Sequence, residues 1–196
     1  MSTVTISDTP FVGNDRLLVG IVLSVLTFWL FAQSVINVVP AMKSSLDISL
    51  ETLTLAVSLS ALFSGCFVVA SGGLADKFGR MRMTTLGLGL SIVGSAMLVV
   101  AQGPGLFLAG RVLQGLSAAC IMPATLALIK TWYEGRARQR AVSFWVIGSW
   151  GGSGLCSFVG GAIATGLGWR WIFVFSIAVA LLALFLLRGF ILVCGS

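Results

Sequence analysis

The chain has 196 residues, of which 58% are hydrophobic and 9% are charged, and its formal net charge is +6. Soluble globular proteins carry about 25% charged residues, so this composition excludes a soluble domain and indicates an all-α, polytopic membrane protein. The chain has no histidine, which excludes histidine-ligated metal and haem sites, and no cofactor is expected. The Lys and Arg residues lie in short breaks between apolar runs, a topological pattern that argues against nucleic acid as a partner.

Six apolar runs follow one another along the chain, each close to the roughly 20 residues that cross a bilayer. They predict six transmembrane helices at 17–39, 51–75, 83–102, 106–129, 141–165 and 171–187. The first run is too long for the apolar region of a signal peptide, so we expect it to remain as a span. Residues 1–16 then form a polar tail, residues 17–188 one helical bundle, and residues 189–196 a short apolar tail.

Basic residues are distributed unequally over the breaks between these helices. Two breaks hold seven of them, at Lys77, Arg80, Arg82, Lys130, Arg136, Arg138 and Arg140, whereas the alternate breaks hold only Lys43 and Arg170. Because cytoplasmic loops carry the excess of Lys and Arg, the first group is predicted to be cytoplasmic. Both termini are then cytoplasmic as well.

A short glycine pattern recurs in the two halves of the chain. Gly72 and Gly73 near the end of the second predicted helix are followed by Gly79 and Arg80, and Gly160 and Gly161 near the end of the fifth are followed by Gly168 and Arg170, on the opposite side of the membrane. An inverted repeat of three plus three helices, which is common among secondary transporters, produces this arrangement. A chance echo of glycines is the alternative.

Arg111 lies inside a predicted helix, five positions from its outer end. An arginine at mid-membrane costs about 2.5–3.5 kcal/mol, so it either reaches the outer interface or faces a polar cavity. Gln114 lies on the same helical face, and Gln33 and Asn37 share a face of the first helix. Because amides that face lipid lack hydrogen-bond partners, we expect these four residues to form one polar cluster inside the bundle.

Small residues form a stripe along the fifth predicted helix. Gly148, Gly152, Cys156 and Gly160 repeat every four residues, and Gly161 widens the small face. Such stripes allow helix backbones to approach closely, so close packing is one interpretation and a sliding contact between helices is the other. The four cysteines each lie alone in an apolar run and are expected to be small buried side chains, not redox or metal sites.

Residues 72–83, GGLADKFGRMRM, contain four of the few charged residues of this apolar chain: Asp76, Lys77, Arg80 and Arg82. Positive-inside bias explains Arg80 and Arg82 but not Asp76, which suits a side chain that caps or pairs across a tight turn at Gly79. The stretch from Gly73 to Arg82 closely resembles the signature cytoplasmic loop of the major facilitator superfamily.

Three further stretches resemble the drug:proton antiporters of that superfamily. LAGRVLQGLSAA (108–119) is similar to their fourth-helix motif, and GWRWIFVFSI (168–177) and VINVVPAM (35–42) are similar to helices of the fourteen-span branch, nearest to Nor-type quinolone and multidrug efflux pumps. The resemblance covers about residues 17–188. It implies a substrate cavity between two six-helix halves, alternating access, and proton-driven export across a bacterial cytoplasmic membrane. It also implies that Arg111 acts in proton coupling and that Asp76 and Arg80 hold the two halves together.

The chain departs from this family in three places. No acidic residue lies near Gln33 in the first helix, and Cys156 and Ser157 replace the Gly-Pro pair of the fifth-helix motif, so any kink there has to come from glycines. The chain also has six predicted helices where the family has twelve or fourteen. We therefore expect the amino-terminal half of an efflux pump, its cavity lined by the polar cluster with Trp29 and Trp150.

The alternative is a non-transporting six-helix remnant, or a half-transporter that needs a missing C-terminal half or a second copy. An enzyme is not expected, because the spans hold no pair of acids, no histidine and no nucleophile–base pair. The expected partners are a small-molecule substrate, protons and the lipid bilayer.

Overall fold

The computed structural model describes residues 14–46 and 48–194, except for the side chains of residues 31, 33–41, 43–46 and 188–194. The described chain is helical, and no strand occurs in it. Its elements are α1 (Asp15–Leu46), α2 (Leu50–Phe78), α3 (Arg80–Val100), α4 (Pro104–Trp132), α5 (Gly135–Val146), the π-helical turn η1 (Ile147–Gly151), α6 (Gly152–Gly166) and α7 (Arg170–Cys194).

Five helical segments of the described chain are long and apolar enough to cross a membrane. These segments are Leu50–Phe78, Arg80–Val100, Pro104–Trp132, Gly135–Gly166 and Arg170–Leu187, and they coincide with five of the predicted spans. The first predicted span lies within α1, a helix of 32 residues, but several of its side chains are outside the described ones. A count of six spans therefore stays a prediction.

Short local signals separate the helices. Ser49 caps α2, because its Oγ accepts the backbone N–H of Thr52 at 3.2 Å. Gly79 divides α2 from α3 with a φ of 102°, a left-handed conformation that glycine adopts without steric cost. α7 runs on to Cys194, beyond its predicted end at residue 187, because the residues after position 189 are again apolar.

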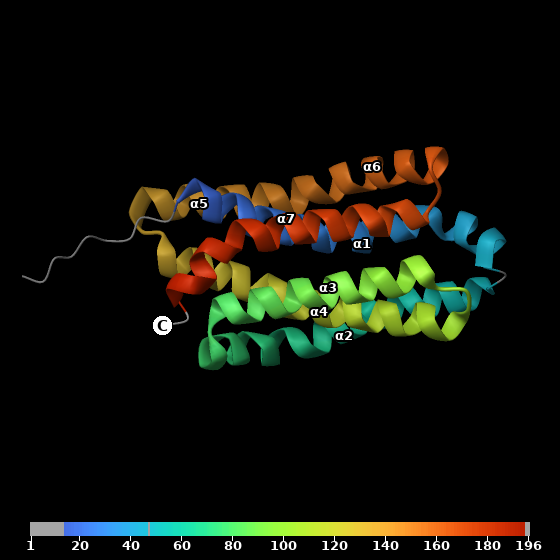
Figure 1. Ribbon diagram of the computed structural model, residues 1–196, viewed down its shortest axis with the longest axis horizontal. Helices are drawn as coiled ribbons and strands as arrows, with labels where there is room; N and C mark the ends of the chain where they lie inside the picture. Colours follow the sequence, from blue (N-terminus) through green and yellow to red (C-terminus); the bar gives the residue numbers. More distant parts are fainter. Residues whose placement is uncertain (1–13, 47, 195–196) are drawn as a thin grey trace, which may run out of the picture.

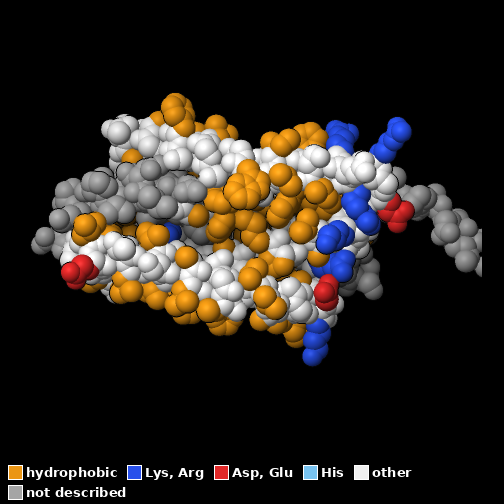
Figure 2. Space-filling view, turned by 180° about the vertical axis from the view of Figure 1, so that it is seen from behind, with side chains coloured by type: hydrophobic (Ala, Val, Ile, Leu, Met, Phe, Trp, Pro, Cys, Tyr) orange, Lys and Arg blue, Asp and Glu red, His pale blue; other side chains and the backbone are white. Residues whose placement is uncertain are grey.

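The helices lie side by side as one elongated bundle (Figure 1). α4 packs against α2 and α3, and α1 packs against α6 and α7; α3 and α7 join the two groups. Figure 1 places the start of α1, the α2–α3 and α4–α5 connections and the end of α7 at one end of the bundle. Figure 2 shows Lys and Arg side chains gathered at one end of the molecule, as the unequal distribution of basic residues over the breaks predicts.

Two large apolar clusters and a smaller one fill the described part of the bundle. The two large ones are distinguished by their largest members. One contains Phe107 and Phe173 and the other contains Leu17 and Leu128, all at most 2% exposed. Large apolar side chains also cover much of the outside: Val69 is 82% exposed and Phe158 is 76% exposed. Such a surface suits a bilayer, whose acyl chains are as apolar as these side chains.

Candidate functional site

Arg111 of α4 is a charged side chain buried in the bundle, with 1% of its surface exposed. Its Nη1 donates to Oε1 of Gln114 at 2.7 Å, and its Nη2 donates to Oγ of Ser60 on α2 at 2.9 Å. The side chain therefore points into the protein and does not reach the outer interface.

The hydrogen bonds continue beyond Arg111 into the neighbouring helices. Nε2 of Gln114 donates to Oγ of Ser95 on α3 at 3.2 Å, and Oγ of Ser60 donates to the carbonyl oxygen of Val57 at 2.8 Å. Gln114 and Ser95 have no exposed surface. An amide of α4 and a hydroxyl of α2 thus solvate the guanidinium, and a hydroxyl of α3 holds the amide in place. These bonds reduce the cost of burying the charge.

Gly115 allows α2 to come close enough to reach Arg111. A Cβ at this position would lie 2.4 Å from the carbonyl oxygen of Ser60 and 3.0 Å from its Cα. No side chain larger than hydrogen fits there without moving the backbone of α2. The contact between Ser60 and Arg111 therefore depends on a glycine four positions after Arg111 on α4.

A cavity of about 420 Å³ opens beside Arg111, within the range of roughly 300–1,000 Å³ that is usual for small-molecule sites. Its wall is apolar except for one guanidinium and two hydroxyl groups. The described residues that line it are Phe28, Ala32, Val57, Ser60, Ala61, Ser64, Gly65, Arg111, Gly115 and Ala118.

The structure brings only part of the predicted polar cluster together. Arg111 and Gln114 are hydrogen-bonded, whereas the side chains of Gln33 and Asn37 lie outside the described ones. The two tryptophans expected in the wall are not among the described residues that line it. Trp150 is 75% exposed on η1, and Trp29 faces α6, 3.9 Å from where a Cβ on Gly152 would lie. Phe28 supplies the aromatic ring of the wall.

The charged loop forms a second site at the junction of α2 and α3. Nε and Nη2 of Arg80 donate to Oδ1 of Asp76 at 3.1 and 2.9 Å, so the pairing expected across the turn at Gly79 is present. Nη1 of Arg80 also donates to Oγ1 of Thr131 and to the carbonyl oxygen of Ala127 at 3.3 Å. Arg80 thus ties the loop to the end of α4.

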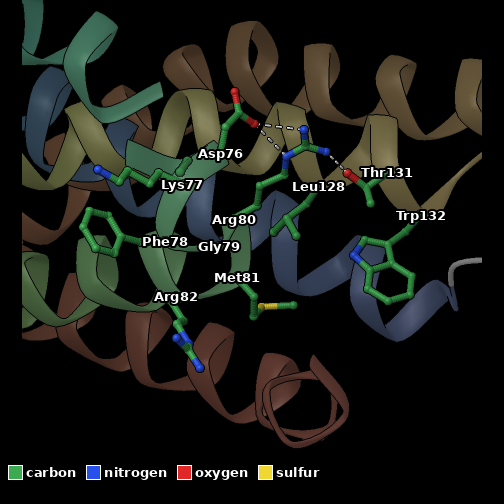
Figure 3. Close-up of a pocket in the computed structure, with 11 residues that line it drawn as sticks. Asp76, Lys77, Phe78, Gly79, Arg80, Met81, Arg82, Leu128, Thr131 and Trp132 are labelled. Carbon is green, nitrogen blue, oxygen red and sulfur yellow. Dashed lines mark hydrogen bonds and ion pairs between the residues drawn. The ribbon is translucent and has the colours of Figure 1, made fainter. Parts of the chain in front are cut away.

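A cavity of about 630 Å³ lies at this loop, lined from Ala75 to Arg82 and by three residues near the end of α4. Figure 3 shows Arg80 turned toward Asp76 and Thr131, with Arg82 on the other side of the loop. Gly73 lies outside this contact, and a Cβ added to it would meet nothing within 4 Å.

The stripe of small residues on the fifth predicted helix faces α1. A Cβ on Gly148 would lie 3.0 Å from Cγ1 of Val22, and one on Gly152 would lie 2.5 Å from Cδ2 of Leu26. Cys156 and Gly160 are buried as well, whereas a Cβ on Gly161 would meet nothing within 4 Å. The helix is not regular here: η1 interrupts it at Ile147–Gly151, the kind of local deformation that glycines permit.

Sequence reasoning missed two members of the Arg111 cluster, Ser60 and Ser95. Serine is common in apolar helices, where its hydroxyl bonds its own preceding turn, so neither residue carries a signal in the sequence. These two serines reach Arg111 and Gln114 only because of the way in which α2, α3 and α4 cross.

Residues 17–193 match the profile of a protein family described as the Major Facilitator Superfamily. The quinolone resistance protein NorB from three strains of Staphylococcus aureus, JH9, Newman and Mu3, is 60% identical to the chain over 183 residues in each case. That alignment covers 93% of this chain and 40% of each relative. The chain therefore spans less than half the length of these relatives.

Proposed function

Since this chain belongs to the Major Facilitator Superfamily, we propose that it forms the amino-terminal half of a proton-coupled pump that exports drugs or other amphipathic small molecules. Membership makes it a multi-pass membrane protein of the transporter class and not an enzyme. The step from transporter to drug exporter depends on its 60% identity with NorB, whose name denotes quinolone resistance.

We propose that the bundle has six spans with both termini in the cytoplasm, arranged as three plus three inverted helices. The five apolar segments and the length of α1 support this number. The basic residues that gather at one end of the molecule support the orientation (Figure 2).

The observation that carries the proposal is the buried arginine beside an apolar cavity. Arg111 is 1% exposed, and it is held by Gln114 and Ser60. A charge at this depth is expensive and marks a substrate or proton pathway in membrane proteins. We assign proton coupling to Arg111 and Gln114, and we retain Gln33 and Asn37 as candidates for the same cavity.

The loop and the stripe take supporting roles in this proposal. The segment from Gly73 to Arg82, with Asp76, Gly79 and Arg80, is the candidate cytoplasmic latch between the two halves of the pump. The small residues from Gly148 to Gly161 are the candidate contact on which α6 moves against α1, because their lack of bulk allows close and adjustable packing.

A half-transporter that needs a second polypeptide, either the C-terminal half or another copy, is the second candidate, together with a non-transporting remnant. A crosslinked dimer that transports in membrane vesicles would support the two-copy form.

Dye accumulation tests the proposal. The protein is expressed from its complete reading frame in bacteria that lack their own drug pumps, and the fluorescence of an amphipathic dye is followed against an empty vector. We expect lower accumulation with the wild type and vector levels with Arg111→Ala, at equal amounts of membrane-inserted protein. Normal export by Arg111→Ala contradicts the role of Arg111, and vector-level accumulation with the wild type favours the remnant.

A further inference from the structure

The cavity beside Arg111 has the composition of a site for an anionic group. Its described wall contains one cation, Arg111, and no Asp or Glu; the hydroxyls of Ser60 and Ser64 are its only other polar side chains. A positive charge among low-dielectric walls focuses its field on the space they enclose. We propose that this cavity binds a carboxylate or sulfonate carried by a flat aromatic molecule, and that the anion replaces Ser60 at Nη2 of Arg111.

Ser60 is suited to be displaced. Its Oγ accepts from Nη2 of Arg111 at 2.9 Å and donates to the carbonyl oxygen of Val57 at 2.8 Å. When an anion takes its place at Nη2, Ser60 loses only the bond that it accepts, and its own donor stays satisfied. The bond from Nη2 to Ser60 joins a cation to a neutral acceptor, whereas a bond to an anion joins two opposite charges, whose attraction is strong in a low-dielectric cavity. The exchange therefore favours the anion.

Gln114 holds the other side of the guanidinium in place. It accepts from Nη1 at 2.7 Å and is itself anchored to Ser95 at 3.2 Å. It has no exposed surface and is not part of the described cavity wall. Arg111 can therefore change its partner at Nη2 without leaving its position, and Ser60 controls how readily an anion binds.

The rest of the wall fits the aromatic part of the ligand. Phe28 offers a ring, and Ala61, Gly65 and Ala118 leave room beside it. A ring system that carries an anion can then stack on Phe28 while its charged group meets Arg111. The inference deepens the proposed function, on which it rests for its place in transport, but binding itself can be measured without transport.

Binding to the purified chain in nanodiscs of zwitterionic lipid tests the inference. Isothermal titration compares naphthoate with its neutral analogue naphthamide, after subtraction of empty nanodiscs. The wild type should prefer naphthoate by about tenfold or more, because Arg111 then meets a charged oxygen and not a neutral amide oxygen, and Arg111→Gln should lose this preference. Ser60→Ala should bind naphthoate about two- to tenfold more tightly, with naphthamide unchanged.

Two variants control for general effects on the cavity. Ser64→Ala removes a hydroxyl one turn along α2 in the same wall and should leave both affinities unchanged, and Ser60→Thr should retain the wild-type values. Equal effects of Ser60→Ala and Ser64→Ala on naphthoate would overturn the inference. A wild type without preference, or one whose preference survives Arg111→Gln, would overturn it too, even if Ser60→Ala does not fold. A protein that shows the preference but exports nothing contradicts the proposed function and leaves the anion site standing.

Discussion

The contact between Gly115 and Ser60 gives a prediction whose size follows from the structure. In the variant Gly115→Ala, the new Cβ would start 2.4 Å from the carbonyl oxygen of Ser60, whereas ordinary contacts begin at 3.4 Å. The obstacle is backbone, which cannot rotate away as a side chain can. α2 therefore has to move from α4 by roughly 1 Å at this point.

This movement breaks the link between the two helices. The hydrogen bond from Nη2 of Arg111 to Ser60, now 2.9 Å, would lengthen to roughly 3.9 Å, which is beyond hydrogen-bond distance. Overpacking of this kind costs about 1–3 kcal/mol. An unhindered Gly→Ala exchange in a helix has the opposite sign and stabilises by about 0.5–1 kcal/mol.

Gly89→Ala on α3 is the matched control, because a Cβ there would meet nothing within 4 Å. Thermal unfolding in detergent, read by size-exclusion fluorescence, should rank Gly115→Ala below the wild type and Gly89→Ala at or above it. Dye export should fall with Gly115→Ala only. If both variants unfold at the same temperature and export equally, the close contact does not position Arg111.

Three further predictions concern other parts of the bundle. Burial, reinforced by a nearby carboxylate, raises the pKa of Tyr133 to about 12. The stability that its neutral phenol confers is therefore present below pH 10 and is lost between about pH 10 and 12. Because Tyr133 is the chain's single tyrosine, tyrosinate absorbance should titrate near pH 12 in the folded protein and near pH 10 in the unfolded one, and equal midpoints would contradict its burial. In Gly152→Ala the new Cβ would clash only with the flexible tip of Leu26, so the free energy of unfolding should stay within about 1 kcal/mol of the wild type, whereas Gly152→Ile should lose about 1–3 kcal/mol. Equal stabilities would show that α6 and α1 do not pack here. Asp76→Asn weakens an exposed ion pair with Arg80 that contributes less than about 1 kcal/mol to stability, so the unfolding temperature should hardly change. Export should fall, because the variant weakens the proposed latch, and unaltered export would contradict that role of Asp76.

The helices were predictable because each membrane span is a long apolar run that can be read directly from the sequence. A run of about 20 apolar residues has one stable form in lipid, the helix, since every backbone group has to be satisfied within the segment. The turn at Gly79 was predictable for a similarly local reason, because Asp76 and Arg80 are four residues apart on either side of a glycine. The cost of charge in a bilayer left two positions for Arg111, the outer interface or the inside of the bundle, and the structure has it inside.

The partners of Arg111 were not predictable from the sequence. Gln114 is one turn away on the same helix, but Ser60 lies 51 positions earlier, and its selection depends on how α2 crosses α4. Gly115 gave no sign of its role either, because glycine is frequent throughout the chain and only the crossing point makes one of them indispensable. The π-helical turn at Ile147–Gly151 likewise lies against α1, a contact that no local pattern reveals.

Proton flux in proteoliposomes tests the central claim most directly. The protein, expressed from its complete reading frame, is reconstituted with a pH-sensitive dye inside the vesicles, a pH gradient is imposed, and an exported drug is added. The account predicts that the drug accelerates the collapse of the gradient with the wild type and has no effect with Arg111→Ala. Drug-driven collapse at equal rates in both proteins, or no drug-dependent collapse with the wild type, would contradict proton-coupled export through Arg111.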